Sequence, residues 1–272
     1  NSLLLNPLYI PLETGTPVLT TYSRVPGNFP MKRIKVKTNP LTFIFLFLMT
    51  SIVWSGERQV DYEGFTLWLD CDKKGASRFE YSLGEDTGNE KRLKKYTRDP
   101  NLGECQQLST RSYRKDTPDH DRGHLVAFNH MDYSVESAKD SNQMANILPQ
   151  TTTLNKGAWL RTEKITECYR EFGTLEIIGG AIWDSNPRIL ETHGVDIPDY
   201  FWKVIFREDD SIAWIMPNDD TATRKALDTF IVSLQEIEKA TGYEFSDNFG
   251  KSAKAAASWG LDACDGIPKW RS

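Results

Sequence analysis

The sequence predicts an α+β fold with a mainly antiparallel β-sheet core and flanking helices. Segments rich in β-branched and aromatic residues, which are typical of strands, alternate irregularly with longer helical patterns. Two of the strand segments are joined across Lys73-Lys74-Gly75, a connection that indicates a hairpin rather than a parallel crossover. Strands that include hairpins and do not alternate regularly with helices favour an antiparallel sheet.

The expected elements follow in order along the chain. Strands are predicted over residues 64–69, 77–81, 124–128, 175–182, 201–206 and 212–216. Helices are predicted over residues 134–145, 154–172 and 223–240. Gly173 follows the second helix and Thr241-Gly242 follows the third, and glycine is typical of a helix C-terminal end.

Residues 31–55 have the pattern of a secretory signal peptide. A basic stretch precedes a thirteen-residue apolar run that ends at Val53, and Ser55 is a small residue at a possible cleavage point. The run is shorter than the roughly 20 apolar residues of a membrane span; a buried core helix or an uncleaved anchor is the alternative. We therefore expect residues 1–30 to be an upstream leader and residues 56–272 to be a single domain. Such a protein would be secreted or periplasmic, without stable membrane association once the signal is removed.

All four cysteines lie in the predicted domain, at Cys71, Cys105, Cys168 and Cys264. An even number of cysteines in an exported chain predicts disulfide bonds, and the sequence leaves all three pairings open. No Cys-x-x-Cys motif occurs, which argues against a structural zinc site.

The predicted domain is acidic, with 28 Lys and Arg against 37 Asp and Glu and a net charge of −9. Bulk charge therefore excludes general attraction to polyanions, and any binding of nucleic acid needs a local basic surface. Residues 91–98 carry five positive charges and no negative one. This segment is the candidate for phosphate contact, and a solvated surface is the alternative.

The segment Asp121-Arg122-Gly123-His124 combines groups suited to phosphodiester hydrolysis. His124 is the candidate general base, because an imidazole titrates near neutrality and can accept a proton from water. Arg122 offers a planar set of donors to phosphate oxygens. Asp121 would orient the imidazole unless a backbone carbonyl does so. Taken alone, these four residues would also fit a loop with an exposed ion pair.

A second motif follows about thirty residues later, with Asn155 and Glu163 on the predicted helix 154–172. Eight residues of helix would separate their Cα atoms by roughly 12 Å. Because helical side chains lean toward the N-terminus, Glu163 would hold a water of an ion that Asn155 binds directly. One amide oxygen with mostly water ligands suits Mg²⁺ and does not suit zinc.

Together, these motifs resemble the DNA/RNA non-specific endonucleases of the ββα-metal superfamily. The matching residues are Asp121-Arg122-Gly123-His124-Leu125, Asn146 with Pro149-Gln150, and Asn155 with Gly157, Trp159 and Glu163. The resemblance extends from about Tyr62 to Gly242, because the Trp202-Lys203-Val204 strand and the end of the last helix are also similar. It implies a ββα catalytic motif within the fold. It also implies one-step hydrolysis of DNA and RNA to 5′-phosphate products with Mg²⁺, for which Mn²⁺ substitutes.

The resemblance also implies roles for individual residues. His124 corresponds to the proton acceptor, Asn155 to the direct Mg²⁺ ligand and Glu163 to a partner of the ion's waters. Arg122 and Asn146 correspond to residues that support the site.

The family supplies a further arginine ahead of the Asp-Arg-Gly-His segment, and its equivalent in this chain is open. Lys94 and Arg98 are the two candidates for this contact with substrate phosphate.

Three other interpretations fit parts of the sequence. His120 and His124 are spaced like a metalloprotease pair, but the glutamate adjacent to the first histidine is missing. A phosphatase for small esters would not need an extended basic segment. The non-enzymatic alternative is an exported nucleic-acid-binding protein with the same fold and no turnover, against which the presence of His124, Asn155 and Glu163 argues.

Overall fold

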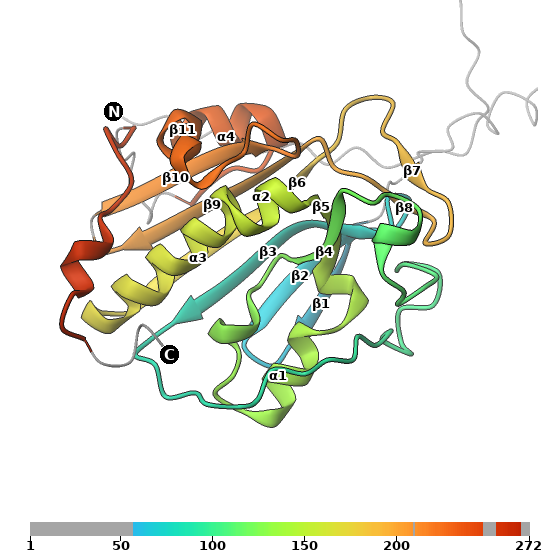
Figure 1. Ribbon diagram of the computed structural model, residues 1–272, viewed down its shortest axis with the longest axis horizontal. Coiled ribbons are helices and arrows are strands. Elements are labelled where there is room, and N and C mark those ends of the chain that lie inside the picture. Colours follow the sequence, from blue (N-terminus) through green and yellow to red (C-terminus); the bar gives the residue numbers. More distant parts are fainter. Residues whose placement is uncertain (1–56, 209, 247–253, 268–272) are drawn as a thin grey trace, which may run out of the picture. The chain divides into compact units, whose positions relative to one another are not determined.

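Within the residues that the structure describes, 57–208, 210–246 and 254–267, the centre of the fold is a seven-stranded antiparallel sheet (Figure 1). In spatial order its strands are β1 (Glu57–Tyr62), β2 (Phe65–Asp70), β3 (Gly75–Leu83), β6 (Leu175–Ile182), β9 (Tyr200–Arg207), β10 (Asp210–Pro217) and β11 (Ile231–Val232). This computed structural model confirms the predicted α+β class. The predicted leader and signal peptide lie outside the described residues.

In the same described residues, two short strand pairs, four α-helices and several 3₁₀ helices accompany this sheet. The pairs are β4 (His120–His124) with β5 (Ile147–Thr151) and β7 (Ile189–Leu190) with β8 (Val195–Asp196). The helices are α1 (Val135–Ser141), α2 (Thr152–Lys156), α3 (Ala158–Tyr169) and α4 (Leu234–Thr241). The antiparallel β4–β5 pair followed by α2 and α3 forms the expected ββα motif. No helix in the described part of the chain is long and apolar enough to span a membrane.

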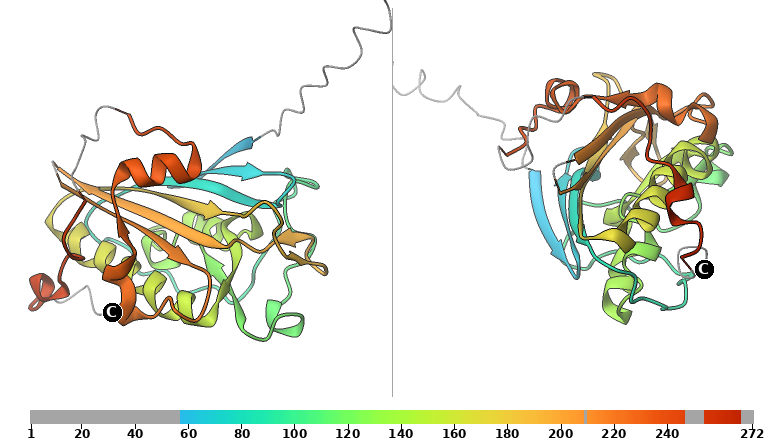
Figure 2. Two further views of the ribbon diagram at one scale, coloured as in Figure 1. Left: turned by 90° about the horizontal axis from the view of Figure 1, so that it is seen from above. Right: turned by 90° about the vertical axis from the view of Figure 1, so that its left-hand side faces the viewer.

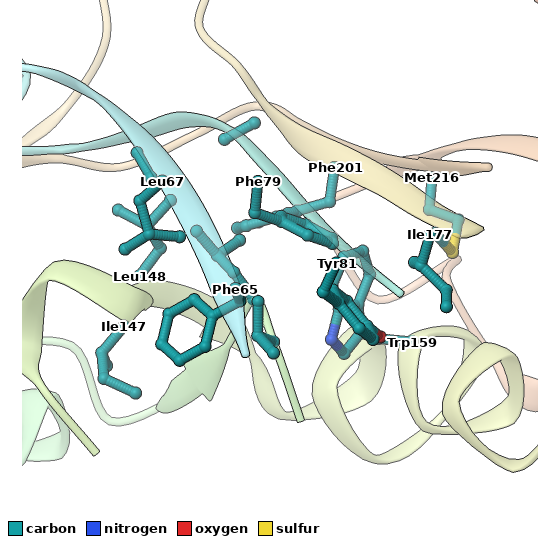
Figure 3. Packing of buried hydrophobic residues seen from close by; sticks show 14 of the residues in the cluster. Phe65, Leu67, Phe79, Tyr81, Ile147, Leu148, Trp159, Ile177, Phe201 and Met216 are labelled. Carbon is teal, nitrogen blue, oxygen red and sulfur yellow. The ribbon is translucent and has the colours of Figure 1, made fainter. Parts of the chain in front are cut away.

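Helices α3 and α4 cover opposite faces of the large sheet (Figure 2). Side chains alternate along β9, so Phe201 packs toward α3 while Trp202 packs toward α4. Trp159 of α3 is fully buried, with its ring centroid 6.4 Å from that of Phe79 and 5.6 Å from that of Phe201 (Figure 3). This aromatic contact fixes α3, and with it the ββα motif, against the centre of the sheet.

The third predicted helix is wrong in its first half. Residues Arg224–Phe230 form a 3₁₀ helix, β11 follows, and α4 begins only after Ser233. Ser233 and Glu236 form a capping box that satisfies the free backbone N–H groups at this start. Gly242 ends the helix in the left-handed conformation with φ of 73°, so the predicted C-terminal end is confirmed.

The strand predicted over residues 124–128 is also wrong, because strand β4 ends at His124 and a 3₁₀ helix, Phe128–His130, follows. Strand β4 is mostly polar, and its partner β5 contains Pro149, which strand patterns disfavour. Strand β4 therefore depends on pairing with β5, which is itself held by Ile147 and Leu148 in the hydrophobic core. The helix predicted over residues 134–145 is shorter than expected and ends at Ser141.

The prediction of disulfide bonds is confirmed, and the structure resolves the pairing. Cys71 bonds to Cys105 and Cys168 bonds to Cys264. The first bond ties the end of β2 to the loop that follows the basic segment. The second ties α3 to the C-terminal 3₁₀ helix Leu261–Cys264.

Candidate active site

A pocket of about 250 Å³ opens beside the end of β4 and the helices α2 and α3. It is lined by Arg92, His124, Ala127, Phe128, Asn129, Asn155, Lys156, Leu160, Glu163, Lys164 and Glu167. The structure therefore brings together His124, Asn155 and Glu163, the three residues with the most specific predicted roles. A larger pocket of about 370 Å³ on the α4 side of the sheet shares none of these residues.

The imidazole of His124 is held in a buried position at the pocket wall. Its ring centroid lies 5.6 Å from that of Tyr96, and its backbone carbonyl accepts a hydrogen bond of 2.9 Å from Nε1 of Trp159. Nε2 of His124 lies 2.9 Å from Oδ1 of Asn142. Burial lowers the pKa of His124 from 6.5 to about 4, while the bond to Asn142 opposes that change. The ring is therefore neutral at pH 7 and able to accept a proton.

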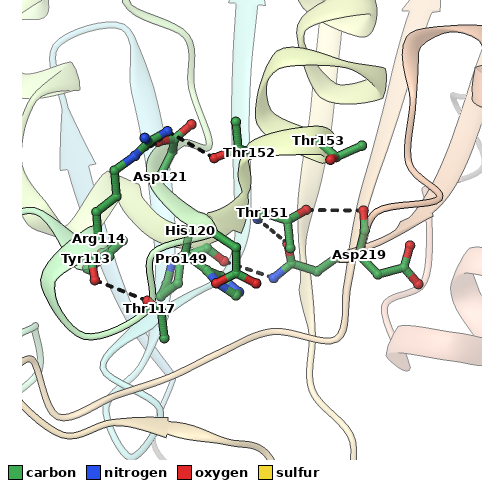
Figure 4. A network of polar contacts seen from close by, with 12 residues as sticks. Tyr113, Arg114, Thr117, His120, Asp121, Pro149, Thr151, Thr152, Thr153 and Asp219 are labelled. Atoms are coloured by element: carbon green, nitrogen blue, oxygen red, sulfur yellow. Dashed lines mark hydrogen bonds and ion pairs between the residues drawn. The ribbon is translucent and has the colours of Figure 1, made fainter.

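Asp121 does not orient His124, which corrects the interpretation made from the sequence. Residues three apart on a strand point to opposite sides, and the Asp121 carboxylate turns toward Arg114, Asn155 and Lys156. Figure 4 shows Arg114 beside Asp121 and Thr152. Partial burial raises the pKa of Asp121, but hydrogen bonds from Arg114 and Asn155 outweigh this effect and lower it.

The carboxylate of Asp121 instead fixes the amide of Asn155. Nδ2 of Asn155 donates to Oδ2 of Asp121 at 3.3 Å. An ionised carboxylate can only accept hydrogen bonds, so the NH₂ end of the amide must face it. The amide oxygen of Asn155 is therefore the end that remains for another ligand.

Asn155 and Glu163 do not lie on one continuous helix, as the sequence had suggested. Gly157 separates α2 from α3, with φ of −108° and ψ of −103°. A Cβ at this position would lie 2.3 Å from the carbonyl oxygen of Thr153 and 2.8 Å from that of Ala222. The separation of roughly 12 Å expected for a continuous helix therefore does not apply.

Glu163 lines the pocket and interacts electrostatically with the buried Lys203. Burial raises the pKa of the Glu163 carboxyl above its usual value, and the positive charge of Lys203 limits this rise. Lys203 extends from β9 with its Nζ 3.0 Å from Oγ1 of Thr162 and 3.7 Å from the ring centroid of Trp159. Burial lowers the pKa of Lys203, and Glu163 favours its charged form. The two groups therefore stabilise each other's charged forms.

Arg122 and Asn146 lie outside the pocket and contact the backbone around it. Nη1 of Arg122 donates to the carbonyl of Thr110 at 2.7 Å, and its guanidinium lies 4.0 Å from the ring centroid of Tyr96. Asn146 is fully buried and pairs with both the N–H and the carbonyl of Val126, each at 2.9 Å. Arg122 thus supports the ring beside His124, and Asn146 fixes the loop that follows it.

The basic segment reaches the pocket through Arg92, which the sequence did not single out. Lys94 and Arg98 are exposed and do not line the pocket, and Nη2 of Arg98 donates to the carbonyl of Gly103 at 3.1 Å. Asn142 was also not predicted. The basic segment is a local signal for Arg92 but does not distinguish it from its neighbours, and Asn142 carries no local signal because it reaches the site through long-range contacts.

The donor set fits a hydrated hard cation. Among the described residues, no group of three or more His, Cys, Asp and Glu side chains is placed to hold a metal ion. The pocket instead offers the oriented amide oxygen of Asn155 and the carboxylate of Glu163. Oxygen ligands and room for several waters suit Mg²⁺. His120 and His124 lie on a strand, so they lack the helical geometry of a metalloprotease pair.

Comparisons with known proteins agree with this geometry. The family model for DNA/RNA non-specific endonucleases matches residues 48–252. Mitochondrial endonuclease G from Homo sapiens is 26% identical over 144 residues, which are 47% of this chain and 48% of that protein. The nuclease of Serratia marcescens is 26% identical over 192 residues, which are 65% of this chain and 71% of that protein.

The chain spans about half the length of the first of these relatives. Among solved structures, the EndoG/EndoGI complex gives a TM-score of 0.59 at 19% identity over 72% of this chain and 88% of that chain, a likeness of fold. The family model covers well over half of the sequence, and this chain belongs to the DNA/RNA non-specific endonuclease family.

Proposed function

We propose that this protein is a magnesium-dependent endonuclease that hydrolyses phosphodiester bonds in both DNA and RNA. The observation that carries the proposal is the meeting of His124, Asn155 and Glu163 in one pocket, although they come from β4, α2 and α3. Family membership supports the same activity. The neutral imidazole and the oriented amide supply the base and the ligand that the reaction needs.

His124 is the proposed general base. The bond to Asn142 occupies Nε2, so Nδ1 carries the lone pair that takes a proton from the attacking water. The low pKa of His124 keeps this nitrogen unprotonated at neutral pH. Removal of that proton makes the water a stronger nucleophile toward phosphorus.

Asn155 and Glu163 are the proposed holders of Mg²⁺. Asn155 would bind the ion through its amide oxygen, and the Glu163 carboxylate would accept hydrogen bonds from the ion's waters. When bound, Mg²⁺ neutralises charge on the phosphate and stabilises the departing oxygen. Lys203 supports this role because its ammonium favours the carboxylate form of Glu163.

Arg92 is the proposed contact for the phosphate that is cleaved, because it lines the same pocket as the base. Lys94 and Arg98 remain candidates for contacts with phosphates farther along the polymer. A site that grips the backbone phosphate carries no sequence information. We therefore expect weak sequence selectivity, activity on both polymers and products that end in 5′ phosphate.

We also propose that the protein is secreted or periplasmic. Two disulfide bonds are typical of proteins from oxidising compartments. The signal-peptide pattern in residues 31–55 supports the same location.

The experiment measures cleavage rate against Mg²⁺ concentration for three variants. His124→Ala should lower the maximal rate by about 10² to 10⁴ with little change in the Mg²⁺ concentration for half-maximal rate, because it removes the base. Asn155→Ala should change both quantities, and Glu163→Gln should do less than either. Glu136→Gln, an exposed change on α1 outside the pocket, is the control. Near-normal cleavage by His124→Ala, or an unaltered curve for Asn155→Ala, would overturn the assignment.

A further inference from the structure

Asn142 is a buried side chain that joins the proposed base to the basic segment. It follows α1 as the C-terminal cap residue and is 2% exposed. Its Nδ2 donates to the carbonyl of Leu93 at 3.1 Å and to that of Lys95 at 3.3 Å. Its Oδ1 lies 2.9 Å from Nε2 of His124. One amide therefore contacts both parts of the site.

These contacts determine which way the amide faces. Backbone carbonyls only accept hydrogen bonds, so the NH₂ group must face Leu93 and Lys95, and Oδ1 must face His124. Oδ1 also only accepts, so Nε2 of His124 must carry the hydrogen. The opposite tautomer would set two lone pairs against each other and leave a buried amide oxygen without a donor.

The backbone around Asn142 holds the same segment in place. The carbonyl of Asn142 accepts a hydrogen bond of 3.2 Å from the N–H of Thr97, whose own carbonyl accepts one of 2.8 Å from Met144. The chain from Leu93 to Thr97 is thus attached along residues 142–144. Arg92 directly precedes this attached stretch and lines the pocket.

We propose that Asn142 is a positioning residue that holds the lone pair of His124 on Nδ1 and anchors the segment that brings Arg92 to the same pocket. The inference rests on the proposed function, in which His124 is the base and Arg92 the phosphate contact. Because one side chain makes both attachments, the base and the phosphate contact keep a fixed relation to each other.

Two substitutions separate the two attachments. Asn142→Leu has a similar size and makes neither hydrogen bond. Asn142→Asp keeps an acceptor for His124 but loses the donor to the two carbonyls. Asn101→Leu, at an exposed position away from the pocket, is the matched control.

The first measurement is the tautomer of His124 by ¹⁵N NMR in the metal-free protein. The wild type and Asn142→Asp should show hydrogen on Nε2, and Asn142→Leu should show a mixture of tautomers. The second measurement is kinetic. Asn142→Leu should lower kcat by about 10- to 100-fold, the usual effect of losing the partner that orients a functional histidine. Asn142→Asp should mainly raise KM for the polymer, because Arg92 is no longer anchored.

Asn142→Asp also has a pH signature that a merely structural role would not produce. The charges that act on His124 are those of Arg92 and Arg122, and Tyr96 lies beside the ring. A new carboxylate at Nε2 favours the imidazolium, so the acid limb of the kcat/KM profile should move to higher pH. The Asp variant carries this test even if Asn142→Leu does not fold.

A wild-type tautomer and wild-type kcat in Asn142→Leu would overturn the inference, as would an unchanged pH profile in Asn142→Asp. His124→Ala separates this outcome from failure of the proposed function. If His124→Ala is inactive while the Asn142 variants behave as wild type, the positioning role alone is wrong. If His124→Ala is fully active, the general base is wrong whatever the tautomer.

Discussion

Substitution of Gly157 by alanine should displace the proposed metal ligand without touching it. The new Cβ would lie 2.3 Å from the carbonyl oxygen of Thr153, 2.8 Å from that of Ala222 and 3.1 Å from the backbone nitrogen of Arg224. All three atoms belong to the backbone, so no side-chain rotation relieves the contact. The backbone must move, either in α2 or in the segment that precedes Arg224–Phe230.

The magnitude follows from these contacts. Overpacking of a tightly packed site typically costs about 1–3 kcal/mol, and we expect the free energy of unfolding to fall by that amount. Asn155 lies two residues before Gly157, so a shift of α2 moves its amide oxygen. A displacement of about 1 Å in a catalytic arrangement costs on the order of 10²-fold in rate.

The assays are urea unfolding and plasmid cleavage at a series of Mg²⁺ concentrations. Gly84→Ala is the matched control, because a Cβ at Gly84 meets no atom within 4 Å. Gly157→Ala should be less stable than this control and should need more Mg²⁺ for half-maximal rate. If both alanine variants share the same stability and the same Mg²⁺ curve, the break between α2 and α3 does not position the ligand.

Three further predictions concern pH, covalent stability and the metal ligand. The pKa of His124 falls from 6.5 to about 4 on folding, so its contribution to the free energy of unfolding is fully present above pH 6.5. As the pH falls toward 4, about 3 kcal/mol of that free energy should be lost. Urea midpoints across this range should show the loss, and His124→Leu should make the loss smaller. Reduction of the bond between Cys168 and Cys264, which are 96 residues apart, should remove about 4–5 kcal/mol, and an unchanged urea midpoint would contradict this. Asp121→Leu removes the hydrogen bond that orients the amide of Asn155. It should therefore raise the Mg²⁺ concentration for half-maximal rate by about 10- to 100-fold, as measured by a Mg²⁺ titration of the cleavage rate.

The sequence predicted the large sheet well where strands alternate or are strongly apolar. Strands β6, β9 and β10 lie where β-branched and aromatic residues cluster. Strand β4 was placed wrongly because it is mostly polar, and β5 was missed because it contains Pro149. The break at Gly157 was missed because helical periodicity continues on both sides of it.

For the site, residue type was a better guide than proximity along the chain. His124, Asn155 and Glu163 were predicted from their chemistry and line one pocket. Asp121 was assigned to the wrong partner because strand geometry, which separates residues three apart, was not predicted there. Asn142 could not be predicted, because its contacts with Leu93 and His124 span 49 and 18 residues.

The central claim is tested most directly by incubating the purified protein with supercoiled plasmid and with ribosomal RNA. Each polymer is incubated with Mg²⁺ and with EDTA, and His124→Ala is run in parallel. The proposed mechanism predicts that the wild type degrades both polymers with Mg²⁺ and neither with EDTA, and that His124→Ala degrades both at least about 10²-fold more slowly. Cleavage that survives exhaustive chelation would contradict the metal assignment, and intact polymers in the presence of Mg²⁺ would contradict the nuclease itself.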